Sequence, residues 1–303
     1  MFEGFELRMV ELPDATLRVR IGGAGPPIML LHGHPRTHTT WHKVAPLLAR
    51  DFTVICPDLR GFGKSSKPQD TIGHQGSSKR AKGRDCSALM RVLGFESFAL
   101  VGHDRGAYTA FRAAMDHPNE ITKLVILDAV PILEAFERCD AKFASMWWHW
   151  FFYLQANKPE QAILANPSAW YGGGPEAMGQ ENYEDFQTAI HDPATVHGML
   201  EDYRAAYSID QHHDAEDRCA GRRLMCPLLV LWSLHDDLEQ IYGDVLDVWR
   251  PWATKLNGWG IDSGHHMAEE APEKLAGILA HFLILKAQQN DLLMTAVGRC
   301  EFE

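Results

Sequence analysis

The chain has 303 residues, 46% of them apolar, and a formal net charge of −11 from 29 basic and 40 acidic residues. This length suits one large α/β domain with an inserted segment, or two domains. The absence of a long basic run argues against a nucleic-acid partner. A stretch of about 18 apolar residues is also absent from the sequence, so we expect no membrane span. The first 20 residues carry charges throughout and predict no signal peptide, and the six scattered cysteines are typical of a cytoplasmic protein with free thiols.

Strand-like and helix-like runs alternate along most of the chain. Residues 15–21 alternate apolar and polar side chains, as a half-buried edge strand does. Compact apolar runs typical of buried parallel strands follow at 27–31, 52–56, 98–101, 123–127 and 228–232. Helices are predicted over 87–93, 107–115 and 272–285. The alternation predicts an α/β fold, with a mostly parallel central sheet flanked by helices.

The alternation stops between about Pro131 and Gly221, where no clear strand occurs and aromatic residues are frequent. We predict a core of residues 1–130 and 222–290, a helical cap of residues 131–221, and a C-terminal tail of residues 291–303 that is either disordered or helical. A separate helical domain is the alternative, which is less favoured because a strand-like run resumes after Pro227. The tryptophans at 147, 148 and 150 are expected in the hydrophobic core.

The sequence Gly102-His103-Asp104-Arg105-Gly106 lies between an apolar run and a helix-like stretch. This is the layout of a nucleophile elbow, a sharp strand-to-helix turn that usually presents a serine. Asp104 takes that place here. A carboxylate is a poor nucleophile toward esters and amides but attacks a saturated carbon that bears a leaving group, forming an ester that water can cleave. The alternative is a buried aspartate in a turn.

Two loops carry residues that such an elbow needs. His34, in the loop after residues 27–31, and Arg105 are expected to supply backbone N–H donors to an oxyanion. Near the end of the chain, His265 follows Gly264 and completes the order nucleophile, acid, histidine, so we expect it to activate water. Its neighbour His266 is expected to be solvated.

The acid that orients the base has two candidates. Asp128 and Asp236 each follow a predicted strand, and the residue patterns leave the choice open. The Arg105 guanidinium could receive a substrate carboxylate, or form a structural ion pair. No histidine or cysteine cluster has the spacing of a metal site, so neither a metal nor another cofactor is expected.

At this point the chain resembles the haloacetate (fluoroacetate) dehalogenases of the α/β-hydrolase fold. The similarity covers roughly residues 27–282, and its most specific part is the Asp-Arg elbow combined with a His-Trp pair in the cap. The segments that carry it are Leu30-Leu31-His32-Gly33-His34-Pro35, Pro57-Asp58-Leu59-Arg60-Gly61, Gly102-His103-Asp104-Arg105-Gly106-Ala107, Leu127-Asp128, His149-Trp150, Glu201-Asp202-Tyr203-Arg204-Ala205 and Ser263-Gly264-His265.

The resemblance implies a hydrolase that releases halide from a 2-halo acid through an aspartyl ester. It implies that Asp104 is the nucleophile, that His265 is the base, and that Asp128 rather than Asp236 is the acid. The implied halide pocket consists of His149, Trp150 and Tyr203, whose N–H and O–H groups are suitable donors. Arg105 matches one of two carboxylate-binding arginines. The small-molecule substrate is the expected partner, and a homodimer is left open.

The chain departs from the family at two places. Tyr108 stands where the second arginine falls, which removes one charge from the carboxylate site. Asp236 follows the strand after which related epoxide hydrolases carry their acid. In those enzymes cap tyrosines protonate the opening epoxide ring, a role that Tyr203 or Tyr207 could have here. An epoxide hydrolase is therefore the alternative function. A third reading is a catalytically silent relative that binds a small molecule.

Overall fold

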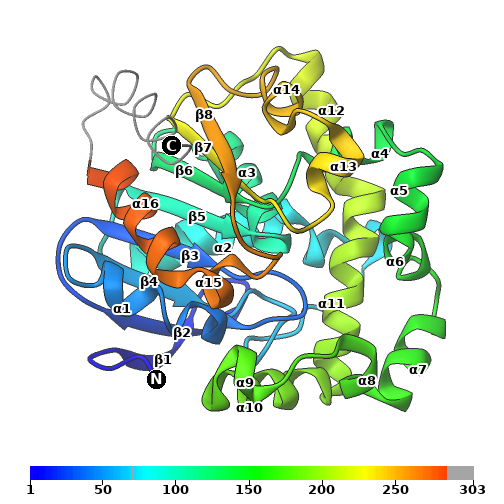
Figure 1. Cartoon of the computed structure of the whole chain (residues 1–303), viewed down its shortest axis with the longest axis horizontal. Coiled ribbons are helices and arrows are strands. Elements are labelled where there is room, and N and C mark those ends of the chain that lie inside the picture. The colour runs from blue at the N-terminus through cyan, green and yellow to red at the C-terminus, as the bar shows by residue number, and fades with distance from the viewer. Residues whose placement is uncertain (70, 285–303) are drawn as a thin grey trace.

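A sheet of eight strands forms the centre of the computed structural model, which describes residues 1–69 and 71–284. The strand order is β1-β2-β4-β3-β5-β6-β7-β8 (Figure 1). The pairs β1–β2 and β2–β4 are antiparallel, and every later pair is parallel, which confirms the predicted mostly parallel sheet. The strands are β1 (Glu6–Glu11), β2 (Thr16–Gly22), β3 (Pro27–Leu31), β4 (Thr53–Pro57), β5 (Phe98–His103), β6 (Ile121–Leu127), β7 (Leu228–Ser233) and β8 (Leu256–Ile261).

The prediction of an edge strand over residues 15–21 is wrong, because β1 covers the outer edge of β2. Most side chains of β1 are exposed, so its residues lack the apolar period by which a strand is recognised. The predicted tail, residues 291–303, lies outside the described residues.

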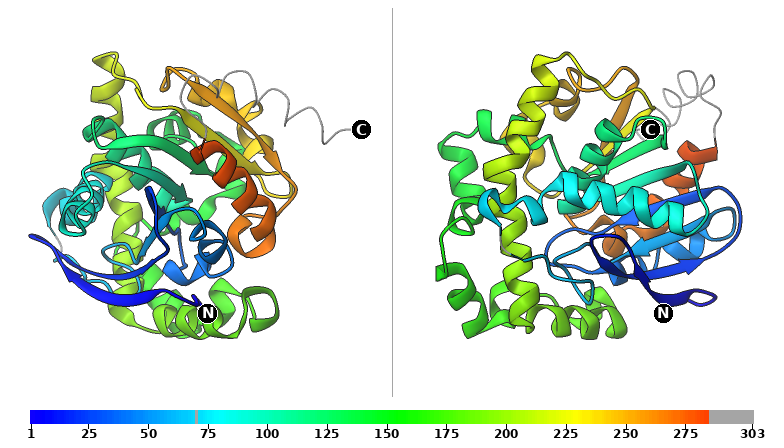
Figure 2. Two further views of the ribbon diagram at one scale, coloured as in Figure 1. Left: turned by 90° about the vertical axis from the view of Figure 1, so that its left-hand side faces the viewer. Right: turned by 180° about the vertical axis from the view of Figure 1, so that it is seen from behind.

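Helices cover both faces of the sheet, as the period-two alternation of strand side chains requires. On β3, Ile28 and Leu30 belong to one apolar layer and Met29 to the other. Figure 2 shows the two helical layers from further sides. The first layer packs under α1 (Ala45–Leu48), α15 (Met267–Glu270) and α16 (Pro272–Ile284), and the second under α2 (Lys79–Val92), α3 (Arg105–Asp116) and α14 (Val245–Trp249). Short helices η1 (His38–Trp41), η2 (Ile72–Ser77) and α13 (Leu238–Tyr242) lie in connecting segments.

All described elements between β6 and β7 are helical. We call residues 131–221 the cap; its division from the core as a domain stays a prediction. Figure 1 shows these helices, green to yellow, along one side of the sheet. They are α4 (Ile132–Glu137), α5 (Ala141–Met146), α6 (Trp148–Phe152), α7 (Lys158–Ala165), α8 (Pro167–Tyr171), α9 (Pro175–Met178), α10 (Gln180–Ile190), α11 (Pro193–Ala205), the π-helix η3 (Ala206–Asp210) and α12 (Gln211–Cys219).

The tryptophans of the cap do not all lie in the core. Trp150 is buried and Trp147 half-buried, but Trp148 is 51% exposed. Residues two apart on a helix point to different faces, so once Trp150 faces inward, Trp148 faces outward. Among the described helices, none has the length and apolar character that crossing a bilayer requires.

Candidate active site

The turn between β5 and α3 holds Asp104 in a strained backbone conformation. Its φ of 49° and ψ of −117° are unfavourable for a residue with a side chain, and such strain is characteristic of functional turns. A Cβ at Gly102 would overlap the backbone of Gly106, so the glycine permits the strand to meet the helix this closely. The predicted elbow is therefore present, with the Asp104 side chain exposed to a pocket.

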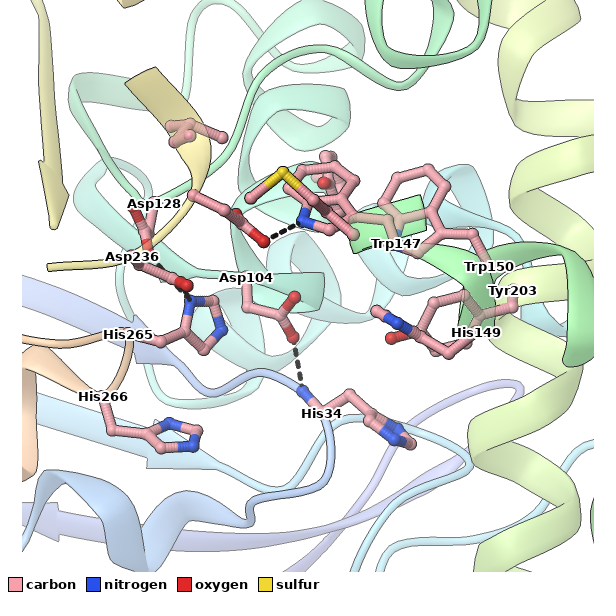
Figure 3. A pocket seen from close by; sticks show the side chains of 14 residues that line it. His34, Asp104, Asp128, Trp147, His149, Trp150, Tyr203, Asp236, His265 and His266 are labelled. Atoms are coloured by element: carbon pink, nitrogen blue, oxygen red, sulfur yellow. Dashed lines mark hydrogen bonds and ion pairs between the residues drawn. The ribbon is translucent and has the colours of Figure 1, made fainter. Parts of the chain in front are cut away.

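The Asp104 carboxylate lies against the loop that follows β3. The backbone N–H of His34 donates to Asp104 Oδ1 at 2.6 Å (Figure 3). A Cβ at Gly33 would overlap the Asp104 side chain, so glycine is required for this approach. The structure therefore places one backbone donor directly on an oxygen of the Asp104 carboxylate.

His265 lies in the loop after β8 and contacts two carboxylates instead of one. Its Nδ1 is 2.7 Å from Asp128 Oδ2 and 3.0 Å from Asp236 Oδ2. The structure thus brings together both candidate acids. Burial acts to lower the pKa of His265, but the hydrogen bonds to Asp128 and Asp236 and their charges outweigh it and raise that pKa well above its ordinary value.

Asp128 is the more deeply buried of the two acids. Its side chain is 2% exposed, against 32% for Asp236, and its Oδ1 accepts the backbone N–H of Ser233 at 3.0 Å. Burial raises the pKa of Asp128. The expectation that His266 is solvated is wrong: it lines the pocket beside His265 and His103, and burial lowers its pKa well below the ordinary value.

The pocket between core and cap has a cavity of about 300 Å³ and two unlike sides. The side we call the core wall consists of His34, Asp104, Tyr108, Asp128, Asp236, Asp237, Leu238, His265 and His266. The side we call the cap wall consists of Met146, Trp147, His149, Trp150 and Tyr203. Figure 3 shows the labelled cap residues facing Asp104 across the pocket.

The cap wall offers donors without charge. Burial lowers the pKa of His149 to about 4, so its imidazole is neutral near pH 7 and keeps one N–H. Burial raises the pKa of Tyr203 well above its ordinary value, so the phenol keeps its proton. The Trp150 indole packs near both Tyr203 and Trp147, with ring centroids 6.0 and 5.1 Å apart. The three residues predicted to bind halide thus line one side of one cavity.

The guanidinium of Arg105 is not free to form the predicted bidentate pair with a substrate carboxylate. Its Nε donates to Asp202 Oδ2 at 2.5 Å and its Nη2 to the Asp202 backbone oxygen at 3.0 Å. Only Nη1 lacks a hydrogen-bond partner in the described part of the chain. The alternative of a structural ion pair, with Asp202 of α11, is therefore the geometry observed.

Asp202 also holds Lys79 and Lys82 of α2, and all three side chains are buried. The residue patterns gave no sign of this cluster, because lysines in a helix are usually solvated. Tyr108 is buried on α3 beside Arg105, its ring centroid 5.0 Å from the guanidinium carbon. Tyr207 is 51% exposed and does not line the pocket, which leaves Tyr203 as the cap tyrosine there.

A further contact at the pocket, between Trp147 and Asp237, was also missed. Trp147 Nε1 donates to Asp237 Oδ2 at 2.6 Å and joins the cap to the loop after β7. Burial and the charge of Asp236 raise the pKa of Asp237 to about 6. The doublet of aspartates after a strand was the signal available in the sequence.

Two groups of the described residues bring three potential ligand atoms within 4.8 Å of one another, and His265 belongs to both. In one group His265 Nδ1 already contacts both carboxylates, and in the other His103 Nε2 lies 2.7 Å from the His265 backbone oxygen, so we assign neither group to a metal. The absence of a cofactor stays a prediction.

The chain is similar to proteins of known sequence and structure over nearly its whole length. A family profile described as the alpha/beta hydrolase fold matches residues 26–270. A fluoroacetate dehalogenase from Burkholderia sp is 40% identical over 93% of this chain and 95% of that protein. A soluble epoxide hydrolase from Corynebacterium sp. (strain C12) is 29% identical, covering 83% and 87%. A solved structure from Nostoc sp PCC 7120, assigned to the alpha/beta hydrolases, matches with a TM-score of 0.91 and 40% identity, covering 94% of this chain and 100% of that one.

Proposed function

The chain belongs to the α/β-hydrolase family, and from this premise we propose that it is a hydrolytic dehalogenase that releases halide from 2-halo acids through an ester on Asp104. The observation that carries the proposal is an aspartate at the strand-to-helix turn, facing a wall of neutral hydrogen-bond donors. The dehalogenase among its relatives supports the reaction class. The substrate is a small molecule; the cytoplasmic location and a homodimer stay predictions.

In the first proposed step, an Asp104 oxygen attacks the carbon that bears the halogen. The carbon–oxygen bond forms as the carbon–halogen bond breaks, and the electron pair of that bond leaves with the halide. His149, Trp150 and Tyr203 are proposed to donate hydrogen bonds to the leaving halide. Fluoride has the greatest need of them, because it is small and strongly hydrated. A serine in the place of Asp104 would direct the chemistry to acyl carbon instead.

In the second step, His265 Nε2 takes a proton from water, whose oxygen attacks the Asp104 ester carbon. The backbone N–H of His34, already 2.6 Å from Asp104 Oδ1, is proposed to stabilise the oxyanion, and that of Arg105 is the predicted second donor. The bond between the Asp104 acyl carbon and the substrate oxygen then breaks, and that oxygen takes the proton back from His265 to give the hydroxy acid. The Asp104 carboxyl loses its own proton to solvent, which restores the carboxylate. The substrate carboxylate is proposed to lie near Tyr108 and the single unpaired Nη1 of Arg105.

Epoxide hydrolysis is the second candidate, because it shares both steps and needs an acid for the ring oxygen. Tyr203 keeps its proton, lies in the pocket, and could supply it. An epoxide hydrolase is also among the relatives.

A substrate panel with isotope labelling tests the proposal. Fluoroacetate, chloroacetate, a haloalkane and styrene oxide are scored for halide or diol. We expect halide from the haloacetates. A single turnover in heavy-oxygen water should leave label on the Asp104 carboxylate, because water attacks the ester carbon. Label that goes directly to product contradicts an ester on Asp104. Release of diol from styrene oxide without halide from the halides would show that the chain is an epoxide hydrolase.

A further inference from the structure

We infer that Asp236 is a second positioning carboxylate for His265, so that the base is held by Asp128 and Asp236 together through one shared Nδ1–H. The inference rests on the proposed function for its catalytic meaning, but its geometry stands alone. The two acceptor oxygens lie 2.7 and 3.0 Å from the same nitrogen, both within hydrogen-bond distance.

The fold explains how two acids reach one histidine. β6 and β7 are paired in parallel, with Leu127 opposite Leu231. Asp128 directly follows the first strand, and Asp236 lies three residues beyond the second, so both are presented at the same sheet edge. His265, which follows β8 on the other side of β7, lies within reach of both. Asp128 is oriented by a φ of 54° and by the Ser233 N–H, whereas Asp236 is the more exposed of the two acids.

The arrangement has a consequence for the second step. Two acceptors on Nδ1 fix the tautomer with its proton on Nδ1, which leaves Nε2 free to take a proton from water. Two negative charges also make His265 a stronger base that is protonated up to higher pH. Hydrolysis of the ester should therefore increase with pH through the titration of His265.

The other groups around His265 do not replace this contribution. The neighbouring imidazoles are held neutral, since burial lowers the pKa of each of them; they are His103, His149 and His266. Asp104 faces His265 as a carboxylate in the free enzyme but is an uncharged ester when the base is needed. Asp237 is nearby, but its oxygen accepts from Trp147. Among the described residues, Asp128 and Asp236 are therefore the carboxylates in contact with His265 Nδ1.

The first test is an NMR titration of the His265 ring in the full chain without substrate. Asp236→Asn should lower the His265 pKa by about one pH unit. Asp237→Asn is the matched control, because it removes the same charge from the same wall without touching His265; its shift should be less than half as large. No shift in Asp236→Asn, or an equal shift in both variants, overturns the inference.

The second test measures turnover in Asp128→Asn, Asp236→Asn and the double variant. Loss of the sole acid of a triad typically lowers the rate about 10⁴-fold. We expect that loss only in the double variant and losses of about 100-fold or less in each single one, with the acidic limb of the pH profile displaced downward in Asp236→Asn. If Asp128→Asn alone is as slow as the double variant, Asp236 does not share the role.

The two tests separate this inference from the proposed function. The titration needs no turnover, so the inference survives if no halide or epoxide reacts. Conversely, an ester on Asp104 with an unshifted titration in Asp236→Asn leaves the function standing and removes the second carboxylate. Asp236 is half-buried, so its variant decides the inference even if Asp128→Asn does not fold.

Discussion

The core wall and the cap wall of one pocket are built by different physical means. Side chains of the core wall are aimed by backbone geometry, with positive φ at Asp104 and Asp128, and by hydrogen bonds to charged groups. Those of the cap wall are held by aromatic packing, with Trp147 stacked on Trp150 at an interplanar angle of 21°. The core wall carries carboxylates and the cap wall neutral donors. Under the proposed function, the core wall would carry out the reaction and the cap wall would bind the leaving group.

Replacing His265 is the largest expected effect on the core wall. His265→Gln should slow turnover about 10²- to 10⁴-fold, because it removes the base that only the second step requires. One equivalent of halide should still appear in a rapid burst, and mass spectrometry should show an ester on Asp104.

Asp104→Asn serves as the control and should show neither burst nor adduct. Normal turnover in His265→Gln together with loss of turnover in His266→Ala would show that His266, and not His265, is the base.

Asp202 joins the cap to the core beside the pocket, and its removal tests how strongly this contact holds the two together. Asp202→Asn leaves the buried cations Arg105, Lys79 and Lys82 without their shared carboxylate and should lower the free energy of unfolding by about 3–5 kcal/mol, measured in urea. Asp185→Asn, which breaks a less buried contact between cap and core, should cost less. Equal, small losses of unfolding free energy in both variants would show that the Asp202 cluster is not the main contact between cap and core.

The same cluster predicts how stability depends on pH. Burial acts to raise the pKa of Asp202, but Arg105, Lys79 and Lys82 outweigh it and hold that pKa well below its ordinary value. A depressed pKa adds stability that is full above the unfolded-state value of about 3.9 and is lost as the pH falls through the folded value. Asp202→Asn should therefore flatten the loss of stability below about pH 4.

The cap wall is tested by removing one donor without changing its packing. Tyr203→Phe keeps the ring and deletes the hydroxyl, and the first step should slow about 10- to 100-fold, the value of a hydrogen bond to a charged group. The loss should be larger for fluoroacetate than for bromoacetate. Trp147→Phe is the comparison, since its N–H already donates to Asp237. Equal losses of rate for all halogens would indicate that Tyr203 does not donate to the leaving halide.

The smallest effect concerns Tyr108, near which the substrate carboxylate is proposed to lie. A charged donor contributes about 1.5–3 kcal/mol and a neutral one about 1, so Tyr108→Arg should lower the KM for haloacetates roughly two- to thirty-fold. For the wild type we expect fluoroacetate to react more slowly than chloroacetate. Tyr108→Phe controls for the hydroxyl. An unchanged KM in both variants indicates that no carboxylate lies there, and would favour epoxides or neutral halides.

Residues whose place at the pocket follows from local pattern were predictable; their roles stay predictions. Asp104, His34 and His265 each follow a strand, and a parallel sheet gathers such loops at one edge. The relation of Asp128 to Asp236 was not predictable, because both follow neighbouring strands and the choice depends on a distance. Asp202 lies in a segment that carries the resemblance, but its contact with Lys82 gave no signal, because the two residues are 120 apart and meet only after cap and core pack together. β1 was missed because its side chains are mostly exposed.

The contact between Arg105 and Asp202 also limits how the enzyme can be recombined. Arg105 directly follows Asp104 in the chain, so the cap helix that carries Asp202 contacts the turn that holds Asp104. A chimaera whose cap comes from another hydrolase and lacks an acidic residue at this position would leave the buried cations Lys79, Lys82 and Arg105 without the carboxylate that they share. Directed evolution by cap exchange should therefore transfer Asp202 together with Lys79, Lys82 and Arg105 as one cassette.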